Sequence, residues 1–116
     1  MSDKLNEVIK QALQFRDARD WKQFHDPKNL AEAISIESGE LLEKFLWMPA
    51  DKSHELSSKK LAETEEEVAD IMIFLIYLCH ALKIDLLKSV EKKIEVNNKK
   101  YPVDKAKGNS RKYKDF

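Results

Sequence analysis

Residues 65–79 read Glu-Glu-Glu-Val-Ala-Asp-Ile-Met-Ile-Phe-Leu-Ile-Tyr-Leu-Cys, an acidic start followed by nine uncharged residues. No Gly or Pro interrupts this stretch, so its backbone can form one continuous helix. The uncharged part, residues 71–79, is far shorter than the roughly 20 residues that cross a membrane. A helix that is apolar on every side must be surrounded by protein. We therefore expect residues 71–79 to pack against other helices of the chain and also against a second subunit.

Three more helices are expected around this one, since apolar residues recur at three- and four-residue steps. The expected helices cover about residues 3–20, 29–48, 58–82 and 86–100. Asn29 is the expected N-cap of the second helix, after a loop that contains Pro27, and Pro49 follows its end. Asp85 is the expected N-cap of the last helix. Residues 103–116 form a polar, basic tail.

The composition favours a single helical domain over residues 1–116. Only two Gly and three Pro occur in 116 residues, which favours long helices over a turn-rich β fold. The single cysteine, Cys79, offers neither a disulfide framework nor a CxxC metal site. The first residues lack the apolar core of a signal peptide. We expect a cytoplasmic protein that has no membrane segment.

Acidic and basic side chains concentrate in different parts of the chain. Residues 1–82 carry 10 Lys/Arg and 16 Asp/Glu, a net charge of −6, whereas residues 83–116 carry 11 and 5, a net charge of +6. A basic segment can bind nucleic acid. Metal-binding carboxylates that face phosphate-binding cations give the same pattern. The second interpretation makes the more specific prediction, because it requires the carboxylates and the cations to meet in one pocket.

Four carboxylates lie where a helical wheel places apolar side chains. With Leu30 set at zero, Glu37 lies near −20°, inside the apolar stripe, and Glu40 lies near −80°, at its edge. Glu67 and Asp70 repeat this spacing on an apolar face of the next helix. Buried carboxylates cost several kcal/mol unless a positive charge compensates them. Because Mg²⁺ prefers oxygen ligands, the pattern predicts a Mg²⁺ site made by these four residues, with Mn²⁺ as a substitute.

The carboxylate motifs and several other segments of the chain match those of a known family in the same order. The two metal motifs are Glu37-Ser-Gly-Glu40 and Glu67-Val-Ala-Asp70. The other matching segments are residues 15–25, 27–30, 45–47, 93–97, 101–102 and 108–113. Together they resemble the MazG-like all-α nucleotide pyrophosphohydrolases, particularly the single-domain dCTP pyrophosphatase branch. The resemblance spans nearly the whole chain and implies a four-helix MazG-like bundle that is completed by oligomerisation.

The resemblance also implies a reaction and a set of site residues. The reaction is Mg²⁺-dependent hydrolysis of a nucleoside triphosphate to the monophosphate and pyrophosphate, as in nucleotide-pool house-cleaning. As a hypothesis from the chemistry alone, a carboxylate accepts the proton of the attacking water, either the ligand Glu37 or Glu66, which lies beside the ligand Glu67. Side chains implied to contact the base or the phosphates are Trp21, Trp47, Lys93, Asn97, Tyr101, Arg111, Lys112 and Tyr113.

Two further expectations concern subunits and base preference. Family members form dimers or dimers of dimers, so a homodimer or homotetramer is implied. Members specific for dCTP have a histidine on the first helix where this chain has Ala12. The resemblance therefore implies dCTP or a related deoxynucleotide as substrate, with a broader range than dCTP alone.

Two rival classes explain part of the pattern. A ferritin-like di-iron bundle also places glutamates on facing helices, but it needs Glu-x-x-His repeats. In this chain, the residues three positions after Glu40 and Glu67 are Glu43 and Asp70, so the required histidines are missing. A non-enzymatic helical module for protein interaction or nucleic-acid binding would use the basic tail. That alternative leaves Glu37 and Glu67 unexplained, and we expect no nucleic-acid partner.

Overall fold

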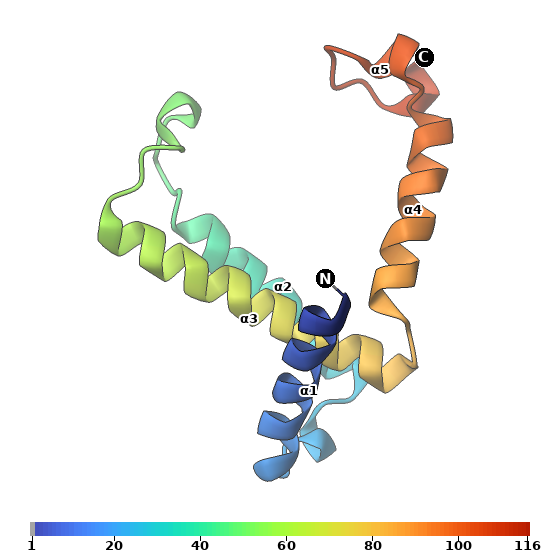
Figure 1. Cartoon of the computed structure of the whole chain (residues 1–116). Coiled ribbons are helices and arrows are strands. Elements are labelled where there is room, and N and C mark those ends of the chain that lie inside the picture. Colours follow the sequence, from blue (N-terminus) through green and yellow to red (C-terminus); the bar gives the residue numbers. More distant parts are fainter. Residues whose placement is uncertain (1) are drawn as a thin grey trace. The chain divides into compact units, whose positions relative to one another are not determined.

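The computed structural model describes residues 2–116, and every regular element in that range is helical (Figure 1). The elements are α1 (Ser2–Ala18), η1 (Lys22–Phe24), α2 (Pro27–Glu43), η2 (Ala50–Lys52), α3 (Ser58–Leu82), α4 (Leu86–Lys100), α5 (Val103–Ala106) and η3 (Tyr113–Asp115). The expected all-α class is confirmed. The chain divides into two compact units, one ending at Lys83 and the other running from Ile84 to Phe116. The expectation that residues 1–116 form a single domain stays a prediction.

In the first unit, α2 and α3 form an antiparallel hairpin and lie side by side, while α1 packs against α3 (Figure 1). The buried core consists of Leu30 from α2 with Ile76 and Tyr77 from α3. Half-buried apolar residues surround this core: Ile9, Ala12, Leu13, Ile73, Phe74 and Leu78. The apolar stretch of α3 is thus the element that α1 and α2 both cover, although Met72 remains 36% exposed.

The start of α2 differs from the expectation. The N-cap is Asp26, not Asn29, because the Asp26 carboxylate accepts a hydrogen bond from the Asn29 backbone N–H at 2.8 Å. Pro27 is therefore the first helical residue and not part of a loop. Proline suits this position, since its fixed φ is helical and its missing N–H would have no partner within the helix.

The end of α2 also differs from the expectation, because the helix stops at Glu43 and not at residues 47–48. The N–H groups of Phe45 and Leu46 donate to carbonyls three residues earlier, at 3.0 and 3.2 Å. Such bonds tighten a last turn and end a helix. Trp47 then adopts a left-handed backbone with φ of 64°, which is uncommon for a bulky residue.

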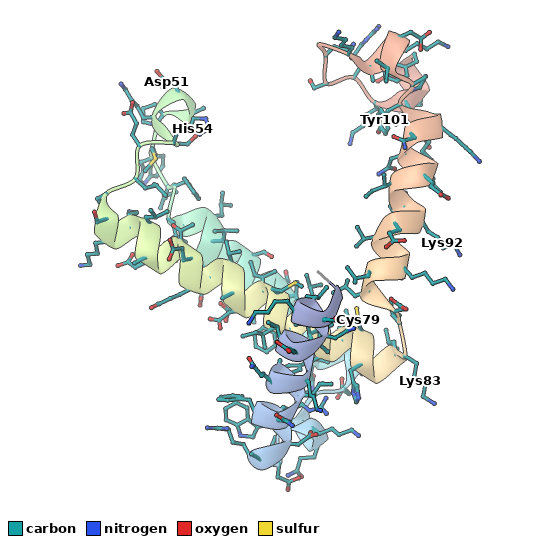
Figure 2. The ribbon with its side chains drawn as sticks, in the orientation of Figure 1. Asp51, His54, Cys79, Lys83, Lys92 and Tyr101 are labelled. Atoms are coloured by element: carbon teal, nitrogen blue, oxygen red, sulfur yellow. The ribbon has the colours of Figure 1, made fainter. Side chains whose placement is uncertain are left out.

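The ends of α3 and α4 are fixed by side-chain and backbone caps. Ser57 accepts a hydrogen bond from the Lys60 N–H at 3.2 Å and starts α3. Lys83, labelled in Figure 2, ends α3 in the left-handed conformation with φ of 57°. Asp85 accepts from the Lys88 N–H at 3.0 Å, which confirms it as the N-cap of α4.

In the second unit, the basic tail folds back onto the end of α4. The Tyr101 ring, labelled in Figure 2, makes edge-to-face contacts with Tyr113 and Phe116 at centroid distances of 5.9 and 5.8 Å. Lys100 Nζ lies 4.8 Å from the centre of the Tyr113 ring. Aromatic and cation–π contacts of this kind fix the tail.

Leu30→Ala should lower the free energy of unfolding by about 2–5 kcal/mol, the range for a large-to-small change in a core. Leu30 is only 1% exposed and joins α2 to α3. Urea unfolding followed by circular dichroism checks the expectation. Leu42→Ala provides the control, because Leu42 on the same helix is 70% exposed. Equal losses in the two variants would contradict the assigned core.

Candidate metal centre and cavity

Three of the expected ligands come together between α2 and α3. One carboxylate oxygen each from Glu37, Glu67 and Asp70 lies within 4.8 Å of the other two. Glu37 and Glu67 are half-buried, while Asp70 is exposed. Their adjacency follows from the antiparallel hairpin, which brings the middle of α2 beside the first half of α3. Glu40, one helical turn after Glu37, is half-buried but lies outside this three-residue cluster.

Two oxygens of the cluster have no hydrogen-bond partner. Oε2 of Glu37 and Oε2 of Glu67 are both buried from solvent and unpaired among the residues described. Buried polar atoms are normally hydrogen-bonded, so an unpaired pair calls for an explanation. A divalent cation held by carboxylate oxygens would satisfy both atoms, and these hard oxygen donors suit Mg²⁺. The residues present therefore fit a divalent metal ion.

The electrostatics of the cluster support the same interpretation. The Glu67 carboxylate, which can accept a hydrogen bond from protonated Glu37, is the largest of three causes that together raise the pKa of Glu37 to about 7. The other two causes are burial and the Glu40 carboxylate. Glu40 therefore influences Glu37 although it lies outside the tight cluster. Without a cation, the cluster stores like-charge repulsion, which a bound cation would relieve.

A cavity of about 480 Å³ lies beside the cluster, between α1, the η1 segment and α3. Its wall is mainly apolar and aromatic, with Phe15, Trp21, Phe74 and Tyr77 among the lining residues. Asp70 belongs both to the cavity wall and to the carboxylate cluster. Cavities of a few hundred Å³ with apolar walls and few polar groups are typical small-molecule sites. This one can hold a flat ring while the rest of the molecule reaches the carboxylates.

The tryptophans expected at the base lie in different environments. Trp21 lines the cavity and contacts Phe15 edge to face, with ring centroids 5.7 Å apart. Trp47 follows the end of α2, is 92% exposed and does not line the cavity. Glu66 on α3 is exposed and is not a member of the carboxylate cluster. The roles expected for Trp21, Trp47 and Glu66 stay predictions.

The remaining expected residues belong to the second unit. Lys93, Asn97 and Tyr101 follow one another at four-residue steps along α4 and its C-cap, so they lie on one face. The Tyr113 ring contacts Tyr101, and the Arg111 guanidinium lies 5.6 Å from the centre of the Phe116 ring. Lys112 is exposed. Their expected contacts with a base or with phosphates stay predictions.

Sequence reasoning missed two polar residues of the cavity wall. Gln11 and His25 both line it, and neither was among the expected site residues. The available signal was the Trp21–His25 segment, in which an aromatic and a histidine flank a short 3₁₀ turn. That segment predicts a cavity only once α1 is known to cross α3.

The all-α hairpin thus places two half-buried carboxylates and one exposed carboxylate beside an apolar cavity, an arrangement that fits a divalent metal ion and a small molecule. The sequence model of the MazG-like family matches residues 33–116. The chain belongs to the MazG-like family.

Several relatives extend this match over nearly the whole chain. dCTP pyrophosphatase 1 from Bos taurus is 36% identical over 114 residues, which cover 97% of this chain and 68% of the relative. The Homo sapiens protein of the same name is 35% identical over 111 residues, covering 94% and 65%. The chain thus spans about two thirds of the length of these relatives. A solved pyrophosphatase from Archaeoglobus fulgidus has a TM-score of 0.80 and 42% identity, covering 85% of this chain and 93% of that one.

Proposed function

We propose that the protein is a Mg²⁺-dependent nucleoside triphosphate pyrophosphohydrolase, which produces a nucleoside monophosphate and pyrophosphate. The observation that carries this proposal is the cluster of Glu37, Glu67 and Asp70 at the edge of an apolar cavity. The relatives named dCTP pyrophosphatase 1 and the Archaeoglobus fulgidus pyrophosphatase support the reaction class. We infer dCTP or a related deoxynucleotide as the substrate.

The carboxylates of α2 and α3 would hold the metal through Glu37, Glu67 and Asp70, with Glu40 beside them. When bound, Mg²⁺ supplies charge neutralisation of the triphosphate and lowers the pKa of a coordinated water. The protein's own part is to orient the phosphates and to accept the proton that the attacking water loses. Glu37 is one candidate acceptor, and the exposed Glu66 of α3 is the other. Proton acceptance by a positioned carboxylate contributes typically 10²–10⁴-fold to a rate.

The cavity would hold the base. Trp21, which is 42% exposed, offers a ring to the cavity, and Ala12 contributes only a methyl group to the wall. A small residue at this position leaves room in the cavity, which favours a broader range than one base alone. Trp47, with its 92% exposed indole, could cover a base only after a rearrangement or from another subunit.

The second unit would contribute cations to the negatively charged leaving group. Residues 83–116 carry a net charge of +6, and phosphoryl chemistry depends on such cations to stabilise developing charge. We propose this role for Lys93, Arg111 and Lys112, with Asn97, Tyr101 and Tyr113 contacting the base or the phosphates. The shared face of α4 and the folded tail support the grouping.

We also propose a homodimer or homotetramer, because large apolar side chains are exposed on every long helix described. They include Ile36, Leu42, Val68, Leu82, Val90 and Ile94, each more than 45% exposed. Exposed apolar surface of this extent typically marks an interface. Light scattering after size-exclusion chromatography should give at least twice the 13.6 kDa mass of the chain. A compact species of 13.6 kDa at micromolar concentration would contradict the expected oligomer.

Product analysis tests the proposed reaction. The protein is incubated with Mg²⁺ and each deoxynucleoside triphosphate in turn, and the products are separated by ion-exchange chromatography. We expect the monophosphate and pyrophosphate in equal amounts, with no activity in EDTA. Orthophosphate as the sole released phosphate would exclude cleavage between the α and β phosphates and overturn the proposal.

No helix in the described part of the chain is long and apolar enough to cross a bilayer.

A further inference from the structure

Arg111 is a cation of the second unit that makes no ion pair with the residues described. Residues 83–116 carry 11 Lys/Arg and 5 Asp/Glu, yet every ion pair found between described residues lies outside this range. The Arg111 side chain is exposed, and its only hydrogen bond among the described residues comes from its backbone N–H. The five N–H donors of its guanidinium therefore remain available to an anion.

One aromatic ring contacts this cation. The guanidinium carbon of Arg111 lies 5.6 Å from the centre of the Phe116 ring. Phe116 is half-buried, whereas every other residue from 107 to 116 is exposed. Its ring packs edge to face against Tyr101, the C-cap of α4, with centroids 5.8 Å apart and an interplanar angle of 87°. Phe116 thus connects the exposed Arg111 to the end of α4.

The backbone of Arg111 is fixed by a different residue. The Asn109 side chain accepts a hydrogen bond from the Arg111 N–H at 3.0 Å and donates one to the Lys105 carbonyl at 3.0 Å. Gly108, with φ of 79°, turns the chain just before Asn109. Asn109 therefore holds the main chain of Arg111, and Phe116 holds its guanidinium. A group held in this way loses less conformational entropy when it binds a ligand.

We propose that Phe116 is a positioning residue, whose ring holds the Arg111 guanidinium where it binds a phosphate of the nucleotide. The inference rests on the proposed function, which supplies the phosphate. Phe116 offers no hydrogen bond of its own, so it acts through Arg111. A ring suits this task better than a carboxylate, because a cation–π contact orients the charge without neutralising it or occupying its N–H donors.

Binding of inorganic pyrophosphate, the proposed product, tests this inference without any turnover. Dissociation constants in Mg²⁺ are measured by calorimetry on the full chain, on Phe116→Leu, on Arg111→Ala and on the double variant. We expect Phe116→Leu to weaken binding by about 2–5-fold, the value of one cation–π contact at an exposed site. In the Arg111→Ala background the same change should have no effect, since the ring then has no cation to hold. Phe116→Tyr keeps the ring and should bind like the parent.

Three results of the calorimetry overturn the inference. Equal weakening by Phe116→Leu in both backgrounds would mean that the ring only supports the fold of the tail. An unchanged dissociation constant in Phe116→Leu would mean that the ring does not position Arg111. A parent protein that does not bind pyrophosphate would mean that Arg111 is not held for a phosphate.

Failure of this inference is distinguishable from failure of the proposed function. Pyrophosphate binding with the expected dependence on Phe116 would support the inference even if no triphosphate were hydrolysed. Hydrolysis with an unchanged dissociation constant would support the proposed function alone. Should the Phe116 variants not fold, nuclear Overhauser contacts between Arg111 and the Phe116 ring in the unaltered protein give a second readout. We expect these contacts to persist when pyrophosphate binds while the Arg111 Nε resonance moves, and their loss on binding overturns the inference.

Discussion

Glu67→Gln should lower the rate of nucleoside triphosphate hydrolysis by about 10²–10³-fold. This loss is larger than that expected for a residue that only supports a metal ligand, and it is comparable to the loss of a group that stabilises charge in the transition state. Glutamine keeps the shape of the side chain but removes the negative charge. The Oε2 of Glu67 is buried and has no hydrogen-bond partner among the described residues, and a bound cation would satisfy it. Initial rates at saturating Mg²⁺ and nucleotide check the expectation.

Glu65→Gln is the matched control for Glu67→Gln, because it makes the same chemical change on an exposed residue of the same helix. Its rate should stay within about twofold of the parent, as surface substitutions usually have small effects. A Glu67→Gln protein that folds and retains the parent rate would remove Glu67 from the metal site. A large loss in both variants would point to α3 stability and not to metal binding.

In EDTA, the protein should become less stable as the pH rises from about 4.5 to about 7. The Glu67 carboxylate, together with burial and Glu40, raises the pKa of Glu37 from 4.5 to about 7. The folded state therefore binds this proton more tightly than the unfolded state does. The resulting stabilisation is complete below pH 4.5 and is lost as the pH passes through 7. Urea midpoints at half-unit pH intervals measure the trend.

Glu37→Gln isolates this contribution from other titrating groups. His25 acts in the opposite direction, since burial and Arg16 lower its pKa and its contribution is lost on acidification. The difference between the parent and Glu37→Gln curves cancels that background. At pH 8 in EDTA, the variant should be the more stable protein, by on the order of 1 kcal/mol after solvent screening. Mg²⁺ should reverse the order, because it stabilises only the protein that binds it. Parallel curves for the two proteins would refute the repulsion assigned to this cluster.

The helices and the carboxylate cluster were predictable from local patterns. Apolar periodicity placed α3, and Asp85 was recognised as a cap because its chemistry acts on the next three residues. The helical wheel put Glu37 and Glu67 on apolar faces, and the α2–α3 hairpin brings them together. Helix positions and caps depend on neighbouring residues in the sequence, and the carboxylate cluster depends on α2 and α3 lying side by side.

Other features depend on contacts between distant segments and were therefore missed. Pro27 suggested a loop, but Asp26 just before it caps a helix, so the same proline fits its first turn. The cavity forms only where α1 crosses α3, and no local pattern indicates that crossing. His25 has no spacing relation to the carboxylates, so its place in the cavity wall follows only from the folded structure.

The most direct test of the metal centre is a crystal soaked in Mn²⁺, which scatters anomalously and can replace Mg²⁺ at carboxylate sites. An anomalous difference map locates such an ion independently of activity. We predict a peak within bonding distance of Glu37, Glu67 and Asp70, roughly 2.0–2.3 Å from their oxygens. A map without a peak at millimolar Mn²⁺, with these carboxylates turned outward into solvent, would contradict the account.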